Sequence, residues 1–246
     1  MKTKLVIVGS KGRMGEALIR LAGRDQTLEV IAGVDKGDNV LDFIDRCDAL
    51  IEFAHHSLSG DLAKIAADHG KPLVIGTTGH TADERQVIET AAQRIALVFA
   101  PNFSVGVNLL FHLTRIAAET LGEDYDEEIV EMHHRQKLDA PSGTARRLGE
   151  ILAEAANGRY EDLALHGRHG DVGARPKRII GMHALRGGDV VGDHTVHFST
   201  VGERLELTHR ASSRDTFASG ALRAAQWAGT QKPGLYSMQQ VLGFKR

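Results

Sequence analysis

Short runs of apolar residues alternate with stretches of helical periodicity along the first hundred residues. The apolar runs are residues 4–9, 28–35, 49–54, 72–76 and 95–100, and helical spacing occupies about 13–23, 57–69 and 81–93. The apolar runs are nearly continuous, as in parallel strands that helices cover on both faces. This rhythm predicts a parallel α/β sheet with five strands.

The pattern changes after residue 108. Apolar spacing predicts a helix of about fifteen residues. A strand over 127–134 follows it, and then a second helix begins at about Gly143. The second half of the chain therefore has a different kind of fold from the first.

Three further strand candidates follow in the second half, at residues 178–185, 193–200 and 203–210. The last of them alternates, with Leu205 and Leu207 on one face. These strands look antiparallel, with one side of their sheet open to solvent or to a partner. Glycine and charge mark residues 167–176 as a loop, and 214–229 has the pattern of a final long helix.

Composition and charge narrow the function classes. The chain has 246 residues, 42% hydrophobic and 25% charged, and a formal net charge of −2. It is long enough to bury a substantial core, and its charge gives no general attraction to nucleic acid or anionic lipid. Cys47 is the only cysteine, which excludes an intrachain disulfide and is compatible with a reducing compartment. The sequence contains no targeting segment and no membrane span, so we expect a cytoplasmic protein without nucleic-acid or membrane partners.

A glycine-rich turn, in the segment VIVGSKGRMGEAL, closes the first strand and opens the first helix. Gly9, Gly12 and Gly15 would let the backbone approach a pyrophosphate at the helix N-terminus. Lys11 stands where the commonest fingerprint has its second glycine, and the glycines alone fit a tight turn without a ligand equally well. The second strand ends at Asp35, 20 residues after Gly15, where an acid accepts the ribose hydroxyls of NAD. Together these features predict dinucleotide binding.

The choice of cofactor depends on two neighbouring charges. Asp35 should repel the 2′-phosphate of NADP, whereas Lys36 could attract it, so we expect NADH or both cofactors to be used. The segments VIGTTGH (74–80) and APNFSVGVN (100–108) each follow a parallel strand and should lie at the carboxyl edge of the sheet, where ligands bind. Their small residues suit a nicotinamide against the backbone, although ordinary βα turns would look the same.

The segment EMHHRQKLDAPSGTA, residues 131–145, leaves a strand and enters a helix. Ser142 or Thr144 can cap this helix, and Gly143 leaves its first amides accessible. A carboxylate or a phosphate is the natural ligand of such a helix start.

Two histidines and a lysine precede this helix. One histidine can deliver a proton while Lys137 stabilises developing negative charge, which is acid catalysis in outline. His133 and His134 point to opposite sides of a strand, so they make a poor ligand pair for one metal ion. The alternative is that the histidines are hydrogen-bonded strand residues and the cations belong to a solvated helix start.

Other candidate chemistry is weaker. Neither His55-His56 nor His194-x-x-His197 completes a metal-ligand set, so we predict no metal site. Cys47 lies between two aspartates that would raise the pKa of its thiol, which indicates a structural role.

The chain closely resembles the 4-hydroxy-tetrahydrodipicolinate reductase (dihydrodipicolinate reductase) family in the following segments, in this order: GSKGRMG, VIGTTG, APNFSVGVN, EMHHRQKLDAPSGTA, GDVVGDHTVHF, GERLELTHRASSRDTFASGA and GLYSMQQVL. The resemblance runs from Lys4 to about Leu242. It implies an NAD(P)H-dependent reduction of 4-hydroxy-tetrahydrodipicolinate, with loss of water, in the diaminopimelate and lysine pathway.

The resemblance also implies roles for individual residues. His133 matches the family's proton donor and Lys137 its charge-stabilising partner, while His134, Gly143 and Thr144 match residues that hold the dicarboxylate substrate. The predicted nucleotide contacts are Gly9, Ser10, Lys11, Gly12, Arg13, Met14, Asp35, Lys36, Gly76, Thr77, Thr78, Ala100, Pro101, Asn102 and Phe103. Among them, Lys36 rests on the charge argument above.

The family's architecture implies a Rossmann-like domain of residues 1–103 and 215–246. Residues 104–214 would form a central α+β domain whose open, mixed or antiparallel sheet assembles a homotetramer. Two features depart from the family. The stretch 36–47 is shorter than in many members, and His55-His56 stand where an arginine-proline pair is common. Because both border the cofactor, the preference between NADH and NADPH is the least transferable feature.

Two other functions remain open at this point. One is an NAD(P)-dependent reductase of another small dicarboxylate imine on the same scaffold, and the other is a non-enzymatic nucleotide sensor. His133, Lys137 and the DAPSGT turn argue against the sensor, which needs no proton donor.

Overall fold

The computed structural model describes residues 1–244 and divides into two compact units. The first unit comprises Met1–Val105 and the C-terminal segment from Arg214, and the second comprises Gly106–Ser213. Each unit has its own sheet and its own core.

The first unit contains a six-stranded parallel sheet in the order β11-β5-β4-β3-β1-β2. Its strands are β1 (Thr3–Val8), β2 (Leu28–Val34), β3 (Ala49–Glu52), β4 (Leu73–Ile75), β5 (Ala96–Phe99) and β11 (Gly234–Tyr236). The five strands predicted from apolar runs are confirmed, but the prediction of a five-stranded sheet was wrong by one strand. β11 has only three residues, too few for a recognisable apolar run, and it pairs in parallel with β5.

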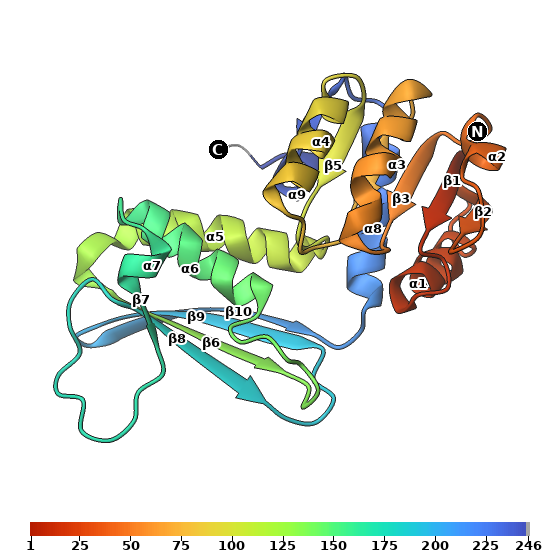
Figure 1. Cartoon of the computed structure of the whole chain (residues 1–246). Helices are drawn as coiled ribbons and strands as arrows, with labels where there is room; N and C mark the ends of the chain where they lie inside the picture. Colours follow the sequence, from red (N-terminus) through yellow and green to blue (C-terminus); the bar gives the residue numbers. More distant parts are fainter. Residues whose placement is uncertain (245–246) are drawn as a thin grey trace. The chain divides into compact units, whose positions relative to one another are not determined.

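Helices cover both faces of this sheet (Figure 1). They are α1 (Arg13–Ala22), α2 (Leu41–Ile44), α3 (His56–Asp68), α4 (Ala82–Ala92), α8 (Asp215–Ala228) and α9 (Met238–Val241). Apolar side chains of α1, α8 and α9 pack on one face, and those of α2, α3 and α4 pack on the other. The strands are therefore buried on both sides, which explains their continuous apolar runs. α8 confirms the helix predicted over 214–229.

The second unit contains a five-stranded mixed sheet in the order β10-β9-β6-β8-β7. Its strands are β6 (Asp126–His133), β7 (Ala164–His166), β8 (Ile180–Arg186), β9 (Gly192–Thr200) and β10 (Glu203–Ala211). The antiparallel pairing expected over 178–211 holds for β9 and β10, but it was wrong for β8. β6 lies between β8 and β9, and it pairs in parallel with β8 and antiparallel with β9.

Helices lie on one face of this second sheet (Figure 1). They are α5 (Val105–Leu121), α6 (Gly143–Ala155) and α7 (Tyr160–Leu163), with a 3-10 turn at Gly122–Asp124. The helices predicted after residue 108 and from Gly143 are confirmed as α5 and α6. Ile129 of β6 is fully buried in the core beneath them. Because side chains alternate along a strand, Ile129, Glu131 and His133 share this helix-covered face.

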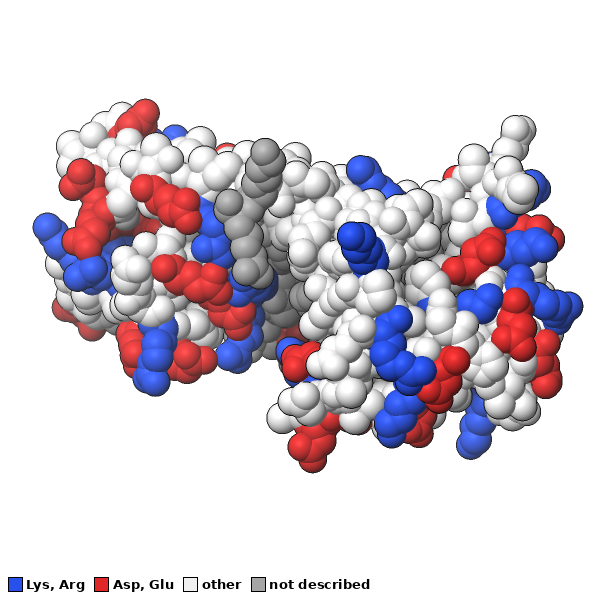
Figure 2. All heavy atoms as spheres, turned by 90° about the horizontal axis from the view of Figure 1, so that it is seen from above, with Lys and Arg blue, Asp and Glu red and all other residues white. Residues whose placement is uncertain are grey.

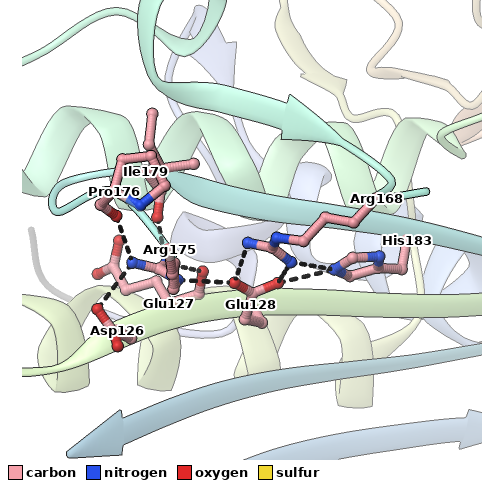
Figure 3. Close-up of polar contacts among 8 residues, drawn as sticks. All are labelled: Asp126, Glu127, Glu128, Arg168, Arg175, Pro176, Ile179 and His183. Atoms are coloured by element: carbon pink, nitrogen blue, oxygen red, sulfur yellow. Dashed lines mark hydrogen bonds and ion pairs between the residues drawn. The ribbon is translucent and has the colours of Figure 1, made fainter. Parts of the chain in front are cut away.

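The loop predicted at 167–176 is confirmed and extends to about residue 179. Arg168 and Arg175 of this loop bind the carboxylate of Glu128 on β6, where His183 of β8 joins them (Figure 3). Glu128 alternates with Ile129, so this loop is anchored on the face of the sheet away from the helices.

The surface carries both signs of charge. In Figure 2, the acidic and basic side chains are intermixed over the visible face. Among residues 1–244, each helix is too short or too polar to cross a membrane.

Candidate active site

The glycine turn after β1 brings backbone and helix together closely. Gly9 has φ +84°, and a Cβ at this position would overlap with the backbone of Phe53. A Cβ at Gly15 would overlap with the carbonyl oxygen of Gly9, so Gly15 lets α1 approach the end of β1. Gly12 is the N-cap of α1 and has no side chain to cover the helix start. The turn therefore leaves a helix N-terminus exposed, as a pyrophosphate site requires.

Asp35 lies beside this turn because β2 pairs with β1. Its carboxylate accepts hydrogen bonds from the Ser10 hydroxyl and from the Lys11 backbone N–H, the latter at 2.8 Å. The hydroxyl of Ser10 lowers the pKa of Asp35, so an anionic acceptor is held at the end of β2. The side chains of Lys11 and Lys36 are exposed next to it. The structure thus brings together the glycine turn and the acid that the sequence placed in one site.

The loops after β4 and β5 reach the same carboxyl edge, because β1, β4 and β5 belong to one parallel sheet. A Cβ at Gly76 would overlap with the ring of Phe53. Thr77 donates a hydrogen bond from its hydroxyl to Glu52, at 2.5 Å. Glu52, at the end of β3, is fully buried, and burial raises the pKa of its carboxyl group.

The other predicted nucleotide contacts of this edge are Arg13, Met14, Thr78, Ala100, Pro101, Asn102 and Phe103, which lie in α1 or in the loops after β4 and β5. Arg13, Thr78 and Pro101 are exposed, whereas Ala100 and Phe103 are buried. Asn102 accepts a hydrogen bond from the backbone N–H of Ser104. These loops thus contain both exposed and buried positions.

A second cluster lies at the end of β6. Glu131 and His133 are two residues apart and share a face, and Nδ1 of His133 lies 2.6 Å from Oε2 of Glu131. The strand register places Arg186 of β8 opposite His133 and His194 of β9 opposite Glu131. Arg186 donates two hydrogen bonds to Glu131, at 2.8 and 2.9 Å. A buried carboxylate with 1% exposure is thus bound by an arginine and a histidine.

The charge states in this cluster follow from burial and from these bonds. Burial alone would raise the pKa of Glu131, but the hydrogen bonds from His133, Arg186 and the Ser142 amide lower it to about 2. Burial, with the nearby His133, lowers the pKa of His194 to about 3. At neutral pH, Glu131 is therefore an anion and His194 a neutral imidazole.

The turn after β6 ends at Ser142, which is hydrogen-bonded to this cluster. Ser142 donates its backbone N–H to Glu131 at 3.1 Å, and its hydroxyl bonds Nε2 of His194 at 3.0 Å. The same hydroxyl accepts from the amide of Ala145, so Ser142 is the helix cap that the sequence left open between Ser142 and Thr144. Lys137 forms an ion pair with Asp139 at 2.9 Å.

The predicted substrate residues flank this cap. His134 is partly exposed, and its backbone N–H donates to Val190 at 2.8 Å. Gly143 and Thr144 are the first two residues of α6. Gly143 is exposed, and a Cβ there would meet nothing within 4 Å. A helix start next to a histidine–carboxylate pair can bind an anion and exchange a proton with it.

Sequence reasoning missed four residues of this cluster, namely Glu131, Arg186, Gly192 and His194. The spacing Glu-x-His within one strand places two side chains on one face and could have revealed Glu131. The others depend on strand pairing. A Cβ at Gly192 would lie 2.9 Å from Nε2 of His133, so this glycine makes room for the imidazole.

Among the weaker candidates from the sequence, His55, His56 and Cys47 have structural partners. His55 caps α3, and His56 lies 2.9 Å from the carboxylate of Glu84. Cys47 is buried, and burial raises the pKa of its thiol. Within residues 1–244, no group of three His, Cys, Asp or Glu side chains could hold a metal ion.

Comparisons with known proteins cover both halves of the chain. The family described as "Dihydrodipicolinate reductase, N-terminus" matches residues 3–103, and the family described as "Dihydrodipicolinate reductase, C-terminus" matches residues 106–242.

Full-length relatives and a solved structure agree with these matches. A 4-hydroxy-tetrahydrodipicolinate reductase from Akkermansia muciniphila is 54% identical over 242 residues, which cover 98% of each chain. One from Syntrophus aciditrophicus is 45% identical over 265 residues, covering 98% of this chain and 99% of the relative. The dipicolinate-bound dihydrodipicolinate reductase from Paenisporosarcina sp. TG-14 has the same fold, with a TM-score of 0.80, 24% identity and coverage of 98% and 99%. The chain therefore belongs to the dihydrodipicolinate reductase family.

Proposed function

We propose that this protein reduces 4-hydroxy-tetrahydrodipicolinate to tetrahydrodipicolinate with NADH or NADPH and releases water, as an enzyme of diaminopimelate and lysine biosynthesis. The observation that carries the proposal is the pairing of His133 with the buried Glu131, 2.6 Å apart, on the strand that leads into the Ser142 helix start. A proton donor next to an anion-binding helix start is what the reduction of a dicarboxylate requires. The family relationship supports the same reaction.

The first unit would bind the nucleotide. Gly9 and Gly15 leave no room for a Cβ, and the open start of α1 suits a pyrophosphate. The anionic Asp35 is placed to accept the ribose hydroxyls, and Lys36 is exposed beside it. We expect NADH to be preferred, or both cofactors to be used. We propose that the remaining nucleotide contacts are Ser10, Lys11, Gly12, Arg13, Met14, Gly76, Thr77, Thr78, Ala100, Pro101, Asn102 and Phe103.

The second unit would hold the substrate. The amides of Gly143 and Thr144 face one carboxylate as the start of α6, with His134 as a further contact. Lys137, on the turn between His134 and Ser142, offsets negative charge on the substrate.

The chemistry divides between the cofactor and the protein. Loss of the ring hydroxyl group and a ring proton as water gives a conjugated imine, and bound NADH or NADPH would supply the hydride that reduces it. His133 then delivers the proton that completes the reduction. The Nδ1 atom of His133 is occupied by Glu131, which leaves Nε2 as the nitrogen that exchanges this proton.

Assembly and location complete the proposal. The helices of the second unit cover one face of its sheet, and the other face, on which Glu128 lies, would assemble a homotetramer. Light scattering coupled to size-exclusion chromatography should give four times the 26.7 kDa of one chain. We further propose that the enzyme works in the cytoplasm on a small dicarboxylate.

A coupled assay tests the function directly. Aspartate semialdehyde and pyruvate are converted by the preceding synthase, and loss of NADH or NADPH absorbance is followed when this protein is added. The proposal predicts oxidation that depends on both the synthase and this protein. Oxidation only with another dicarboxylate imine would identify the rival reductase, and nucleotide binding without any turnover would identify a sensor.

A further inference from the structure

Glu131 is buried directly behind the proposed proton donor, yet neither the proposed reaction nor the sequence motif assigns it a role. We infer that Glu131 is a positioning residue that fixes the imidazole of His133 with its retained proton on Nδ1, so that the transferred proton leaves from Nε2. This inference rests on the proposed function of His133. It adds a requirement for the tautomer and the orientation of that side chain.

The direction of the hydrogen bond follows from the charge of Glu131. With a pKa of about 2, the carboxylate is ionised at neutral pH and can only accept hydrogen bonds. Nδ1 of His133, 2.6 Å from Oε2, must therefore be the donor. When His133 is neutral, its one ring proton is on Nδ1 and the lone pair is on Nε2.

Arg186 and Ser142 prevent the carboxylate from turning. Arg186 contacts both oxygens of Glu131, at 2.8 and 2.9 Å, and the backbone N–H of Ser142 reaches Oε1 at 3.1 Å. Arg186 also donates to the backbone carbonyl of Asp139 at 2.7 Å. Arg186 therefore orients Glu131 and also holds the turn that carries Lys137.

His194 and Gly192 shape the other sides of the imidazole. The ring of His194 lies 5.1 Å from that of His133 at an interplanar angle of 74°, in an edge-to-face arrangement. Because His194 is neutral, it adds no second positive charge beside a protonated His133. Gly192 lies beside Nε2 and keeps this side of the ring free of a side chain.

The proton step balances with this arrangement. The imidazolium carries protons on both nitrogens, and the Nε2 proton moves to the substrate carbon. The electron pair of the new C–H bond comes from the substrate, and Nε2 keeps the pair of the broken N–H bond. The product imidazole retains its Nδ1 proton in the bond to Glu131, and solvent restores the proton on Nε2.

Nitrogen NMR of the whole protein, labelled with ring-15N histidine, tests this inference without substrate or cofactor. The His133 signal is assigned by its loss in His133→Gln, and the spectrum is recorded at a pH where the imidazole is neutral. We expect a protonated Nδ1 and an unprotonated Nε2. A neutral His133 with its proton on Nε2 in the wild-type protein would overturn the inference.

Glu131→Gln should reverse the tautomer. The oxygen of the new amide should take the Oε1 position, where Nη2 of Arg186 and the Ser142 N–H both donate, whereas Oε2 meets only Nη1 of Arg186 besides His133. The NH₂ group then faces Nδ1 of His133, and the ring proton moves to Nε2. Glu128→Gln is the matched control, because it removes a carboxylate with similar partners from the other face of β6. We expect the Nδ1–H form to persist there, and circular dichroism verifies the fold of both variants.

The possible results separate the two proposals. An unchanged His133 tautomer in a folded Glu131→Gln protein contradicts the inference. A move of the His133 ring proton to Nε2 in Glu128→Gln contradicts it as well. If Glu131→Gln does not fold, the wild-type tautomer alone decides. If NMR shows the expected tautomer but the coupled assay shows no turnover, the proposed reductase function is rejected. The inferred geometry of Glu131 and His133 then still holds.

Discussion

Glu131 and Glu128 stand three residues apart on β6 and have nearly the same partners. Each carboxylate binds arginine and histidine side chains, and each has a pKa lowered to about 2 by these bonds against the effect of burial. They differ in the face that they occupy. Glu131 lies on the helix-covered face and binds Nδ1 of His133, whereas Glu128 lies on the opposite face and binds Nε2 of His183 (Figure 3).

The same kind of ionic contact has a different effect on each face of β6. Around Glu128, the arginines come from the loop after β7, so these ion pairs fasten a loop to the sheet. Around Glu131, Arg186 comes from the neighbouring strand, and the histidine keeps Nε2 for a ligand next to a helix start. The same ionic bonds thus secure a loop in one place and orient a proton donor in the other.

The largest expected effect separates the two histidines. His133→Gln should lower kcat by about 10² to 10⁴-fold with a smaller change in KM, because a general acid acts in the transition state. His183→Gln should leave kcat within about twofold, since His183 binds Glu128 on the face of the sheet away from His133. Steady-state assays at saturating cofactor measure both variants. Near-normal turnover of His133→Gln would end the assignment of His133 as proton donor.

Two glycines offer a matched steric test. A Cβ at Gly192 would press on Nε2 of His133 from 2.9 Å, whereas one at Gly181 would overlap with the carboxylate of Glu128. Gly192→Ala should therefore lower kcat by about 10- to 100-fold through displacement of the imidazole. Gly181→Ala should keep kcat and lower the free energy of unfolding by about 1–3 kcal/mol. Equal losses of kcat in both variants would contradict the division of roles.

Asp35 extends the comparison to a carboxylate that a hydroxyl and a backbone amide hold instead of an arginine. Its charge stays available to a ribose. Asp35→Ala should raise the KM for NADH by about tenfold, because one charge-assisted hydrogen bond is lost. The difference in KM between NADH and NADPH should therefore become smaller. Kinetics with both cofactors measure this. An unchanged KM for NADH would remove Asp35 from the ribose site.

In acid, Glu128 and Glu131 should behave alike. Their folded pKa values of about 2 lie below the 4.5 of an unpaired glutamate. The unfolded chain therefore takes up protons first as the pH falls. The stability contributed by each carboxylate is complete above pH 4.5 and is lost between pH 4.5 and 2. Glu128→Gln and Glu131→Gln should each reduce the fall in Tm over this window, by similar amounts, in thermal unfolding followed by circular dichroism. If only one of the two variants reduced the fall in Tm, the two carboxylates would contribute differently to stability.

Local pattern was enough to predict much of the molecule. Continuous apolar runs gave the parallel strands because both faces of the first sheet are buried. Glycine spacing and the position of Asp35 placed the turn and the acid together, since β1 and β2 are neighbours. The segment from His133 to Gly143 could be recognised because its residues are consecutive around one turn.

Features that depend on pairing between distant segments could not be predicted. Arg186 and His194 reach Glu131 only because β6 lies between β8 and β9, and no sequence period encodes that order. β11 is too short to carry a pattern of its own. Glu52 is a buried acid at the end of an apolar strand, and its hydrogen bonds to Ser59 and Thr77 come from two other segments.

The rate of the coupled reaction in three proteins shows whether Glu131 orients the proton donor of a working reductase. Wild type, Glu131→Gln and Glu128→Gln are compared at saturating cofactor with synthase-generated substrate. We expect wild type and Glu128→Gln to oxidise NADH or NADPH at similar kcat. The kcat of Glu131→Gln should fall by about tenfold or more, because the ring proton of His133 is then on the wrong nitrogen. Equal rates in the two variants, or no oxidation by the wild-type protein, would contradict this expectation.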